Sequence, residues 1–458
     1  MEGITLSDAV EAMRGEWIGK NDPAAIVPTG GNINTRTIKP GEVFFALPGE
    51  QVDGHRFTNA AFAKGASAAV VNRSWFTKQK SPSESLIVVE ATDLALGDLG
   101  RHYRKRFDIP VIAITGSSGK TTTKDMMAAV LSTRYNVMAA RGNLNTRLGV
   151  PLTLFDLSAQ HDVAVIEMGI SEHGGLRYLC EIAQPTIGTI TNIGPTHLEF
   201  LGSVEGVAKA KGELLDYLDE SSMTILNLDD LFLFKERATV KGRLLDIGIE
   251  RICQFRGEGL KLDQKGFANF SLQGHSFHLS IPGKHNVYNA LIAAAAGWAL
   301  GVPLEDAAKA LANFTPTVHR SQMLEHNGIR LINDSYNANP ASMRAALDTL
   351  SEIETDGRRV AVLGDMRELG EITDGAHREL GTEAGNRPID ALYALGELSE
   401  WVAEGAREAG LDQSWAFRDQ EALTEALRDY LKPGDLILIK GSRGLAMEGL
   451  VAALGFKI

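Results

Sequence analysis

Cysteine is nearly absent from this sequence, because its 458 residues include only Cys180 and Cys253. Two distant cysteines cannot form a disulfide framework or a cysteine-rich metal site. No apolar run approaches the roughly 18 residues that a transmembrane helix needs. The N-terminus, Met1-Glu2-Gly3-Ile4, lacks the basic segment and apolar stretch of a secretory signal. We therefore expect a cytoplasmic protein that does not insert into a membrane.

Basic residues are also scarce. The 46 Lys and Arg residues are outnumbered by 58 Asp and Glu residues, which gives a formal net charge of −12. This balance argues against a protein that coats nucleic acid, so no nucleic-acid partner is expected. It leaves anionic substrates open, because one loop can bind phosphate within an acidic protein. Apolar residues at 44% and charged residues at 23% indicate a globular chain and exclude collagen-like, coiled-coil and wholly disordered classes.

The order of apolar runs predicts an α/β protein of three domains, and the length agrees at about 150 residues per domain. We place the domains at residues 1–108, 109–317 and 318–458. The first is mixed α/β, with buried strands predicted at 43–47, 68–71 and 86–89 and a helix at 94–107.

The second and third segments alternate strands with helices, which is typical of parallel βαβ units. In the second segment, an antiparallel extension is expected over 251–281 and an Ala-rich helix over 286–300. The third segment predicts a small doubly wound, Rossmann-like domain. The strands expected in these two segments are 111–115, 163–166, 186–191, 329–332, 359–363, 391–395 and 435–439.

The strongest local signal is a glycine-rich turn between a strand and a helix. It consists of Gly116, Ser117, Ser118, Gly119, Lys120, Thr121 and Thr122. Glycines let the backbone approach phosphate, and the helix N-terminus adds partial positive charge. Lys120 would reach the β- and γ-phosphates of a nucleotide, and the Thr121 hydroxyl would suit Mg²⁺. Because two residues rather than four separate the glycines, this is a shortened phosphate loop; the alternative is an ordinary strand–helix turn.

Further motifs follow this loop in a fixed order. They are Gly142-Asn143-Leu144-Asn145, Glu167-Met168-Gly169, Gly194-Pro195-Thr196-His197-Leu198-Glu199, Ala210-Lys211-Gly212-Glu213, His285-Asn286-Val287-Tyr288-Asn289, Asp334-Ser335-Tyr336-Asn337-Ala338-Asn339-Pro340, Leu363-Gly364-Asp365-Met366-Arg367-Glu368-Leu369-Gly370 and Lys440-Gly441-Ser442-Arg443-Gly444. Over nearly the whole chain, this order resembles the Mur ligase family of ATP-dependent amide-forming enzymes. The motifs beginning at Asp334 and Leu363 resemble the branch that adds D-alanyl-D-alanine to UDP-N-acetylmuramoyl-tripeptide in peptidoglycan synthesis.

The resemblance implies a reaction in which ATP phosphorylates a carboxylate and an amine attacks the acyl phosphate. It assigns the three domains, in order, to the UDP-muramoyl peptide, to ATP and to D-alanyl-D-alanine. It also implies ATP and Mg²⁺ as cofactors, with two ions expected. The catalytic candidates are Lys120, Glu167, His197 and Lys211, and the metal-binding candidates are Thr121, Glu167, His197 and Lys211.

Three of these candidates have a plainer interpretation. Glu167, at the end of an apolar strand, could be a solvated residue, and His197 could simply orient its loop. Lys211 would repel Mg²⁺ as an ammonium, but the resemblance implies that CO₂ converts it to a carbamate that can bind a metal. Lys209 is the alternative site of this carbamate, and both lysines could instead lie on a solvated helix face.

The remaining ATP contacts are implied by the same resemblance. Asn286 and Asn289 share a helix face and would contact adenine, although Asn286 could equally cap the helix. Arg320 and Asp334 would contact the phosphate and the ribose. Because both lie in the third segment, ATP would bridge two domains, and domain closure would complete the site.

Substrate contacts are expected in three places. Thr35 and Arg36 resemble the start of the family's UDP-binding segment, in which Asn34 replaces the usual acid. Asn143, Asn145 and Thr146 would touch the muramoyl peptide or its pyrophosphate. The dipeptide contacts would be Asn337, Asn339, Ser342 and Asp365, although turn chemistry alone could account for the asparagines.

Rival functions remain open at this point. One is a sibling ligase that adds a single amino acid, such as diaminopimelate or lysine. Another is a nucleotide-binding switch that forms no bond, and a third is a degenerate relative kept as a scaffold. For the ligase we expect a monomer.

Overall fold

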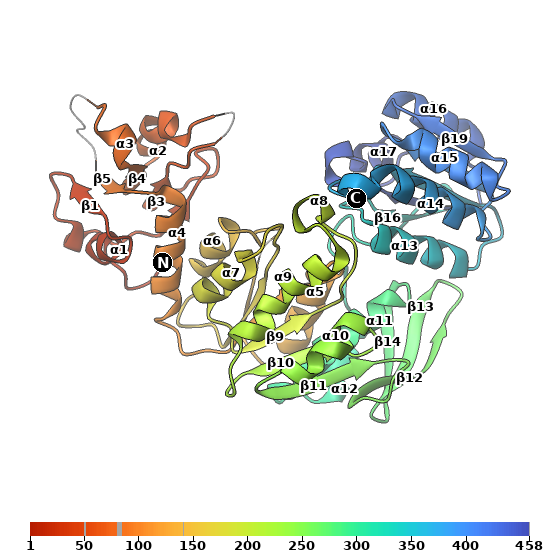
Figure 1. The fold of residues 1–458 in the computed structure, drawn as a ribbon, viewed down its shortest axis with the longest axis horizontal. Coiled ribbons are helices and arrows are strands. Elements are labelled where there is room, and N and C mark those ends of the chain that lie inside the picture. The colour runs from red at the N-terminus through yellow and green to blue at the C-terminus, as the bar shows by residue number, and fades with distance from the viewer. Residues whose placement is uncertain (50–51, 80–84, 141, 458) are drawn as a thin grey trace.

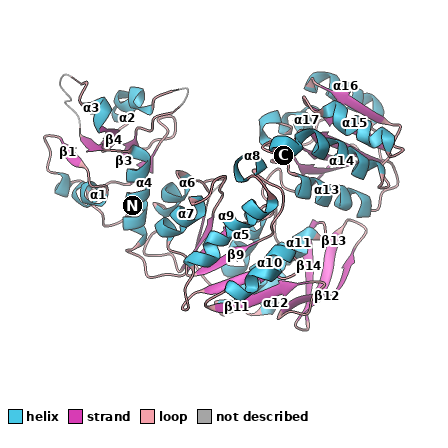
Figure 2. Ribbon diagram, in the orientation of Figure 1, coloured by secondary structure: helices cyan, strands magenta, loops and turns pink. Residues whose placement is uncertain are grey.

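Three β-sheets organise the chain, which confirms the predicted three-domain α/β fold (Figures 1 and 2). The computed structural model describes residues 1–49, 52–79, 85–140 and 142–457. The central domain lies between the other two, which occupy opposite ends of an elongated molecule (Figure 1). Residues 105–110 and 313–321 link the sheets. The boundaries that we place at 108 and 317 stay predictions.

The N-terminal sheet has the order β1-β5-β4-β3-β2, parallel except for β1. Side chains alternate strictly along β3: Val43 and Phe45 face one core, whereas Phe44 faces the other. Helices α2 and α3 cover the second core, and α4 covers the first. The elements are α1 (Leu6–Ala12), β1 (Glu16–Ile18), η1 (Pro23–Ala25), β2 (Gly30–Asn32), β3 (Glu42–Phe45), η2 (Gly54–Phe57), α2 (Thr58–Ala63), β4 (Ala68–Asn72), α3 (Arg73–Phe76), β5 (Leu86–Val89) and α4 (Thr92–Arg104).

The central sheet has the order β14-β13-β12-β11-β10-β9-β6-β8-β7. In this order, all neighbours from β12 to β7, with β6 among them, pair in parallel. Strands β12, β13 and β14 form the predicted antiparallel extension. Helices cover both faces of the parallel part, which explains its continuous apolar runs. Its strands are β6 (Val111–Thr115), β7 (Val137–Ala139), β8 (Val163–Glu167), β9 (Ile187–Ile190), β10 (Met223–Asn227), β11 (Arg243–Gly248), β12 (Phe255–Leu262), β13 (Phe267–Leu272) and β14 (His275–Pro282).

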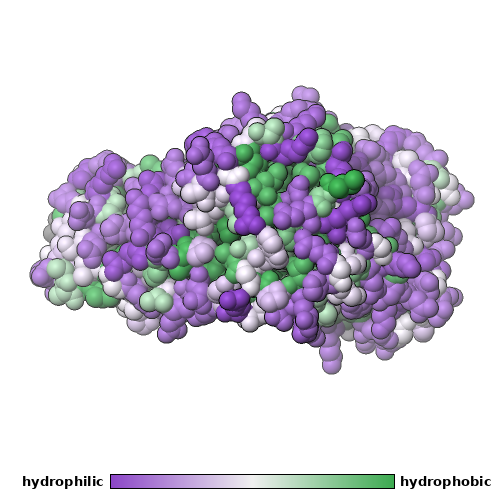
Figure 3. All heavy atoms as spheres, turned by 90° about the horizontal axis from the view of Figure 1, so that it is seen from below, coloured by the Kyte–Doolittle hydropathy of each residue, from purple (hydrophilic) through white to green (hydrophobic). Residues whose placement is uncertain are grey.

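The helices of the central domain divide between the two faces of this sheet. Helices α5, α11 and α12 pack on one face, and α6, α7 and α9 pack on the other. They are α5 (Lys120–Leu131), α6 (Gly149–Leu154), α7 (Gly175–Ala183), α8 (Leu198–Leu201), α9 (Val204–Tyr217), α10 (Leu231–Glu236), η3 (Arg237–Thr239), α11 (His285–Ala299) and α12 (Leu304–Ala312). From below, apolar side chains gather over this domain on an otherwise mostly hydrophilic face (Figure 3).

The C-terminal sheet has the order β15-β16-β20-β17-β18-β19, parallel except for β15. Its elements are β15 (Gln322–His326), β16 (Ile329–Asp334), α13 (Pro340–Glu352), β17 (Arg359–Gly364), η4 (Gly370–Ile372), α14 (Thr373–Gly385), β18 (Ala391–Leu395), α15 (Ser399–Glu408), β19 (Ser414–Phe417), α16 (Gln420–Tyr430), β20 (Leu436–Lys440), η5 (Arg443–Leu445) and α17 (Glu448–Ala453). None of the described helices is long and apolar enough to cross a membrane.

Candidate active site

A cavity of about 770 Å³ lies where the central and C-terminal domains meet. The structure brings most of the predicted site residues to its wall. These are Ser117, Ser118, Gly119, Lys120, Thr121, Thr122, Asn143, Asn145, Thr146, Glu167, His197, Asn286, Asn289, Arg320, Asp334, Asn337, Asn339 and Ser342. Five other predicted residues do not line it: Thr35, Arg36, Gly116, Lys211 and Asp365.

The phosphate loop leaves β6 at Thr115 and enters α5 at Lys120. Two glycines allow its path. Gly116 and Gly119 have φ angles of 144° and 79°, and a Cβ at Gly119 would lie 2.6 Å from the Asn289 Oδ1 atom. The Ser118 amide donates to the Asn192 side chain at 3.0 Å. The loop is therefore fixed in the open turn that a phosphate group would fill.

Lys120 folds back over this loop, and its ammonium donates to the Gly116 carbonyl at 2.7 Å. Desolvation lowers the pKa of Lys120, although the nearby Glu167 carboxylate opposes the shift. Bound phosphate would supply further negative charge to this ammonium. The loop thus offers one cation and several backbone amides to a polyphosphate.

The Glu167 carboxylate, at the end of β8, is held from two sides. Thr121 Oγ1 donates to one oxygen at 2.8 Å, and Asn145 Nδ2 donates to the other at 2.7 Å. Hydroxyl and carboxylate oxygens are the ligands that Mg²⁺ prefers, usually together with substrate phosphates and water. The described residues contain no cluster of three or more His, Cys, Asp or Glu able to hold a metal alone. The donor set therefore fits a metal that arrives with a nucleotide.

Lys211 is a buried cation on α9, with 1% of its surface exposed. Burial, together with the charge of Lys120, holds the pKa of Lys211 well below its usual value. The described residues give its ammonium no hydrogen bond or ion pair. Lys209, two residues earlier on α9, is exposed. Of the two lysines, Lys211 is the one whose surroundings favour a neutral amine.

His197 is the N-cap residue of α8, with a φ of 53°, and its side chain reaches the C-terminal domain. Its Nδ1 atom pairs with a carboxylate oxygen of Glu368, a residue that the sequence motif contained but to which we assigned no role. The hydrogen bond from His197 lowers the pKa of Glu368. Because 171 residues separate His197 from Glu368 in the sequence, no local pattern could predict this contact.

Asn286 and Asn289 form a buried chain of amides rather than open contacts. Asn289 Nδ2 donates to Asn286 Oδ1 at 2.9 Å, and Asn286 Nδ2 donates to the Pro282 carbonyl at 2.7 Å. Thr123 donates to Asn289 Oδ1 at 3.0 Å. Both asparagines line the cavity, and their contact with adenine stays a prediction.

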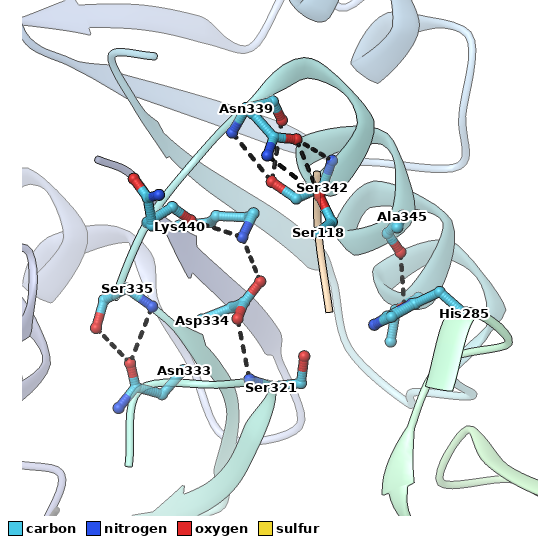
Figure 4. Close-up of polar contacts among 12 residues, drawn as sticks. Ser118, His285, Ser321, Asn333, Asp334, Ser335, Asn339, Ser342, Ala345 and Lys440 are labelled. Atoms are coloured by element: carbon cyan, nitrogen blue, oxygen red, sulfur yellow. Dashed lines mark hydrogen bonds and ion pairs between the residues drawn. The ribbon is translucent and has the colours of Figure 1, made fainter. Parts of the chain in front are cut away.

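The C-terminal wall of the cavity is built around Asp334 (Figure 4). Its carboxylate accepts from the Ser321 amide at 3.1 Å and from Lys440 Nζ at 2.5 Å. Lys440 also donates to the Asn337 carbonyl at 2.9 Å. The sequence marks the strand–helix turn that Lys440 begins as one that could bind a carboxylate, although Lys440 is not among our predicted site residues. Arg320 lies beside this group, with its guanidinium 4.1 Å from the centre of the Tyr336 ring.

Asn339 bridges the two domains instead of standing free for a substrate. Its side chain caps α13 by accepting from the Ser342 amide at 2.9 Å. The same side chain donates to the Ser118 hydroxyl of the phosphate loop at 3.1 Å (Figure 4). Asp365 serves a turn within the C-terminal domain, where it accepts from the amides of Glu397 and Leu398 at 2.9 and 3.2 Å. The role of each residue in binding the dipeptide stays a prediction.

A second cavity, of about 500 Å³, lies between the N-terminal and central domains. Leu47, Pro48 and Asp93 line one side, and a Thr146–Leu148 segment lines the other. The Thr35–Arg36 turn lies outside it. In this turn the Asn34 side chain accepts from the Arg36 amide at 2.9 Å, a bond that the usual acid could also form. Asn34 therefore preserves the turn despite the lost charge.

Comparison with known proteins gives matches along the whole chain. Three family models match in order: the Mur ligase family catalytic domain at residues 29–104, the Mur ligase middle domain at 114–297, and the Mur ligase glutamate ligase domain at 319–443. The UDP-N-acetylmuramoyl-tripeptide–D-alanyl-D-alanine ligase of Bacillus subtilis is 37% identical over 428 residues, which cover 92% of each chain.

Solved structures agree with these matches. A crystal structure of MurF from Acinetobacter baumannii is 32% identical, with a TM-score of 0.88 over 98% of both chains. The MurF ligase of Thermotoga maritima in complex with ADP is 27% identical, with a TM-score of 0.82 over 93% of this chain and 96% of that chain.

Proposed function

The chain belongs to the Mur ligase family, and from this premise we propose that it joins D-alanyl-D-alanine to UDP-N-acetylmuramoyl-tripeptide. The reaction consumes ATP and yields ADP, phosphate and the UDP-muramoyl-pentapeptide precursor of peptidoglycan. The Bacillus subtilis relative and the structural neighbours bear the name of this ligase. We place the reaction in the cytoplasm and assign it to a monomer.

The observation that supports this proposal best is the convergence of the two cavities. Thr146, Ile170 and Ser171 line both of them. An acceptor held between the N-terminal and central domains can therefore extend towards the phosphate loop. A dipeptide bound by the C-terminal domain reaches the same loop from the other side. Three substrates can thus meet at Lys120, as amide formation requires.

The first chemical step activates the acceptor. A carboxylate oxygen of the tripeptide attacks the γ-phosphorus of ATP, the bond to the bridging oxygen breaks, and ADP leaves. Lys120 and the loop amides stabilise the charge on the transferred group. Thr121 and Glu167 would hold magnesium, which neutralises phosphate charge when bound. Asn145 keeps the Glu167 carboxylate turned towards Thr121.

The second step forms the amide. The dipeptide amine attacks the acyl carbon, the tetrahedral intermediate expels phosphate, and the nitrogen loses a proton. We assign Asn337 and Ser342 to the amine substrate, because both line the cavity on its C-terminal wall. Asn339 holds this wall against Ser118, and we assign Asp365 to the support of the neighbouring turn.

The environment of Lys211 supports a carbamate at this position. Only a neutral amine attacks CO₂, and burial favours the neutral form of Lys211. The neutral nitrogen bonds to the carbon of CO₂ and releases one proton, which converts the amine into an anionic carbamate. We propose that this anion, together with His197, serves a second magnesium ion.

The nucleotide and acceptor contacts complete the proposal. Asn286 and Asn289 lie beside the phosphate loop, where adenine would follow the phosphates, and Arg320 and Asp334 face the loop from the C-terminal domain. We assign Asn143 and Thr146 to the muramoyl peptide. Thr35 and Arg36 remain assigned to the UDP end.

The deciding experiment measures phosphate release from ATP and Mg²⁺ with the UDP-muramoyl-tripeptide, with and without D-alanyl-D-alanine. We expect release that depends on the dipeptide, and a product heavier by one dipeptide residue. Release that instead depends on L-lysine or diaminopimelate with the shorter acceptor would identify a sibling ligase. Hydrolysis indifferent to every amine would support a nucleotide switch and contradict the proposal.

A further inference from the structure

Two loops from different domains meet at the rim of the main cavity. One follows β9 and carries His197, and the other follows β17 and carries Glu368. Besides the side-chain pair between these residues, the Glu199 amide donates to the Glu368 carbonyl at 3.3 Å. A Cβ at Gly370 would lie only 3.2 Å from the Glu199 Cα atom. The loops are therefore in direct backbone contact, and Figure 1 shows α8 reaching the C-terminal domain.

Both partners of the side-chain pair have left-handed backbones. The φ angles are 53° at His197 and 61° at Glu368. For residues other than glycine, this conformation costs about 1 to 2 kcal/mol, and it persists where surrounding contacts compensate for the cost. In the second loop, His377 supplies one such support, since its Nε2 atom accepts from the Met366 amide at 2.9 Å. Strain at both ends of one contact indicates that the fold maintains it.

We propose that Glu368 is a positioning residue of this ligase, which orients the His197 ring only when the C-terminal domain is docked. The inference rests on the proposed function, because it gives the amine domain a part in arranging the catalytic loop of the ATP domain.

The chemistry of the pair fixes the ring. A carboxylate only accepts hydrogen bonds, so His197 Nδ1 must donate. The ring nitrogen left for the cavity is then Nε2, and rotation that would exchange the two nitrogens breaks the bond. A carboxylate behind an imidazole is a common way to set its tautomer and direction, and losing it typically costs about 10- to 100-fold in activity. Both residues line the cavity.

The chain offers a matched control. Lys284 of the central domain pairs with Glu352 of the C-terminal domain, so this ion pair also crosses the interface. Its lysine is 58% exposed, and Glu352 does not line the main cavity. Glu352→Gln therefore removes an interdomain ion pair without touching the His197 loop.

The test compares Glu368→Gln with Glu352→Gln in the full chain, alone and combined with His197→Ala. Product is counted by mass over long incubations, so that slow variants remain measurable. We expect Glu368→Gln to lower kcat by about 10- to 100-fold, with the KM for D-alanyl-D-alanine within about 3-fold. Glu352→Gln should change kcat by less than about 2-fold. When Glu368→Gln is added to His197→Ala, kcat should fall by less than about 2-fold relative to the His197→Ala single variant.

Three results would overturn the inference. Equal losses in the two single variants would show that Glu368 only holds the domains together. A normal kcat in Glu368→Gln would show that the pair has no role in turnover. A further loss of 10-fold or more on the His197→Ala background would show that Glu368 acts without His197. Absence of dipeptide-dependent turnover in the unaltered protein would instead count against the proposed function.

Discussion

The two interfaces of the central domain differ in what holds them. One apolar core runs without interruption from the N-terminal domain into the central domain and joins Leu99 of α4 to Leu154 and Ile182. The cores of the C-terminal domain contain only its own residues among those described. Its interface with the central domain instead includes polar contacts, such as Lys284 with Glu352 and Asn339 with Ser118.

Because of this difference, we expect the N-terminal domain to be fixed against the central domain and the C-terminal domain to be able to move. Burial of apolar surface is non-directional and strong, so the first interface resists separation. Exposed ion pairs contribute little, about 0 to 1 kcal/mol each. An interface made of them can open and close at low cost, as loading ATP and a dipeptide into a shared cavity requires. The acceptor side is therefore the rigid half of the active site.

The largest expected effect comes from Arg104, at the end of α4. Its buried guanidinium donates to the carbonyls of Ala183 and Ile109 at 2.9 and 3.1 Å. Arg104→Ala leaves these acceptors buried without partners and should lower the free energy of unfolding by about 3 kcal/mol. Urea unfolding measures the loss, and the exposed neighbour Lys105→Ala is the control. A change equal to that of the control would mean that the first interface is not held as described.

A smaller effect of opposite sign is expected at Lys211, on the rigid side. Because its pKa is lowered in the folded protein, the unfolded chain binds more protons between that pKa and the ordinary value. Stability should therefore rise with pH across this window. In CO₂-free buffer at about pH 7, Lys211→Met should stabilise the fold by about 1 to 2 kcal/mol and remove the slope, while activity is lost. Lys209→Met should change neither the stability nor its dependence on pH. Urea unfolding measured across a range of pH tests both expectations.

An intermediate loss is expected at Asn339, on the movable side. Asn339→Ala removes a helix cap, worth about 1 kcal/mol, and also the bonds to Ser118. Ser342→Ala weakens the same capping box but leaves the Ser118 contact in place. We expect both variants to lose similar stability, and only Asn339→Ala to raise the KM for ATP, by about 3-fold or more. Identical KM values would show that the cap is the only role of Asn339.

The smallest effect is expected for the exposed ion pair. Lys284→Ala should change the free energy of unfolding by less than about 1 kcal/mol, and salt should abolish the difference. Unfolding at about 0.05 and 0.5 M NaCl measures this. A loss comparable to that of Arg104→Ala would erase the distinction between the two interfaces.

Local patterns predicted much of this molecule. The apolar runs located the main strands, and the glycine spacing located the phosphate loop between β6 and α5. The motifs, and the family resemblance that they carry, also named eighteen residues that line one cavity, and the roles of these residues stay predictions. These successes share a cause, since each depends on residues that are close together in the chain.

Contacts between distant segments escaped prediction. The partner of His197 lies 171 residues away, and Lys440 reaches Asp334 over 106 residues. The same limit applies to Arg104. Its contribution to stability depends on backbone carbonyls of α7 and of the segment before β6, and no pattern of side chains in the sequence identifies these acceptors. Such pairs depend on how the domains pack, which local periodicity does not contain.

The continuous first core has a consequence for the order in which the chain matures. Its members extend from Met1 to Leu233, so the first hundred or so residues leave the ribosome without the helices that complete their packing. They must wait for α6, α7 and α9 to emerge. The last domain has two cores, and both consist of its own described residues. We therefore expect the enzyme to fold as one large unit followed by a small one, although its sequence predicts three domains.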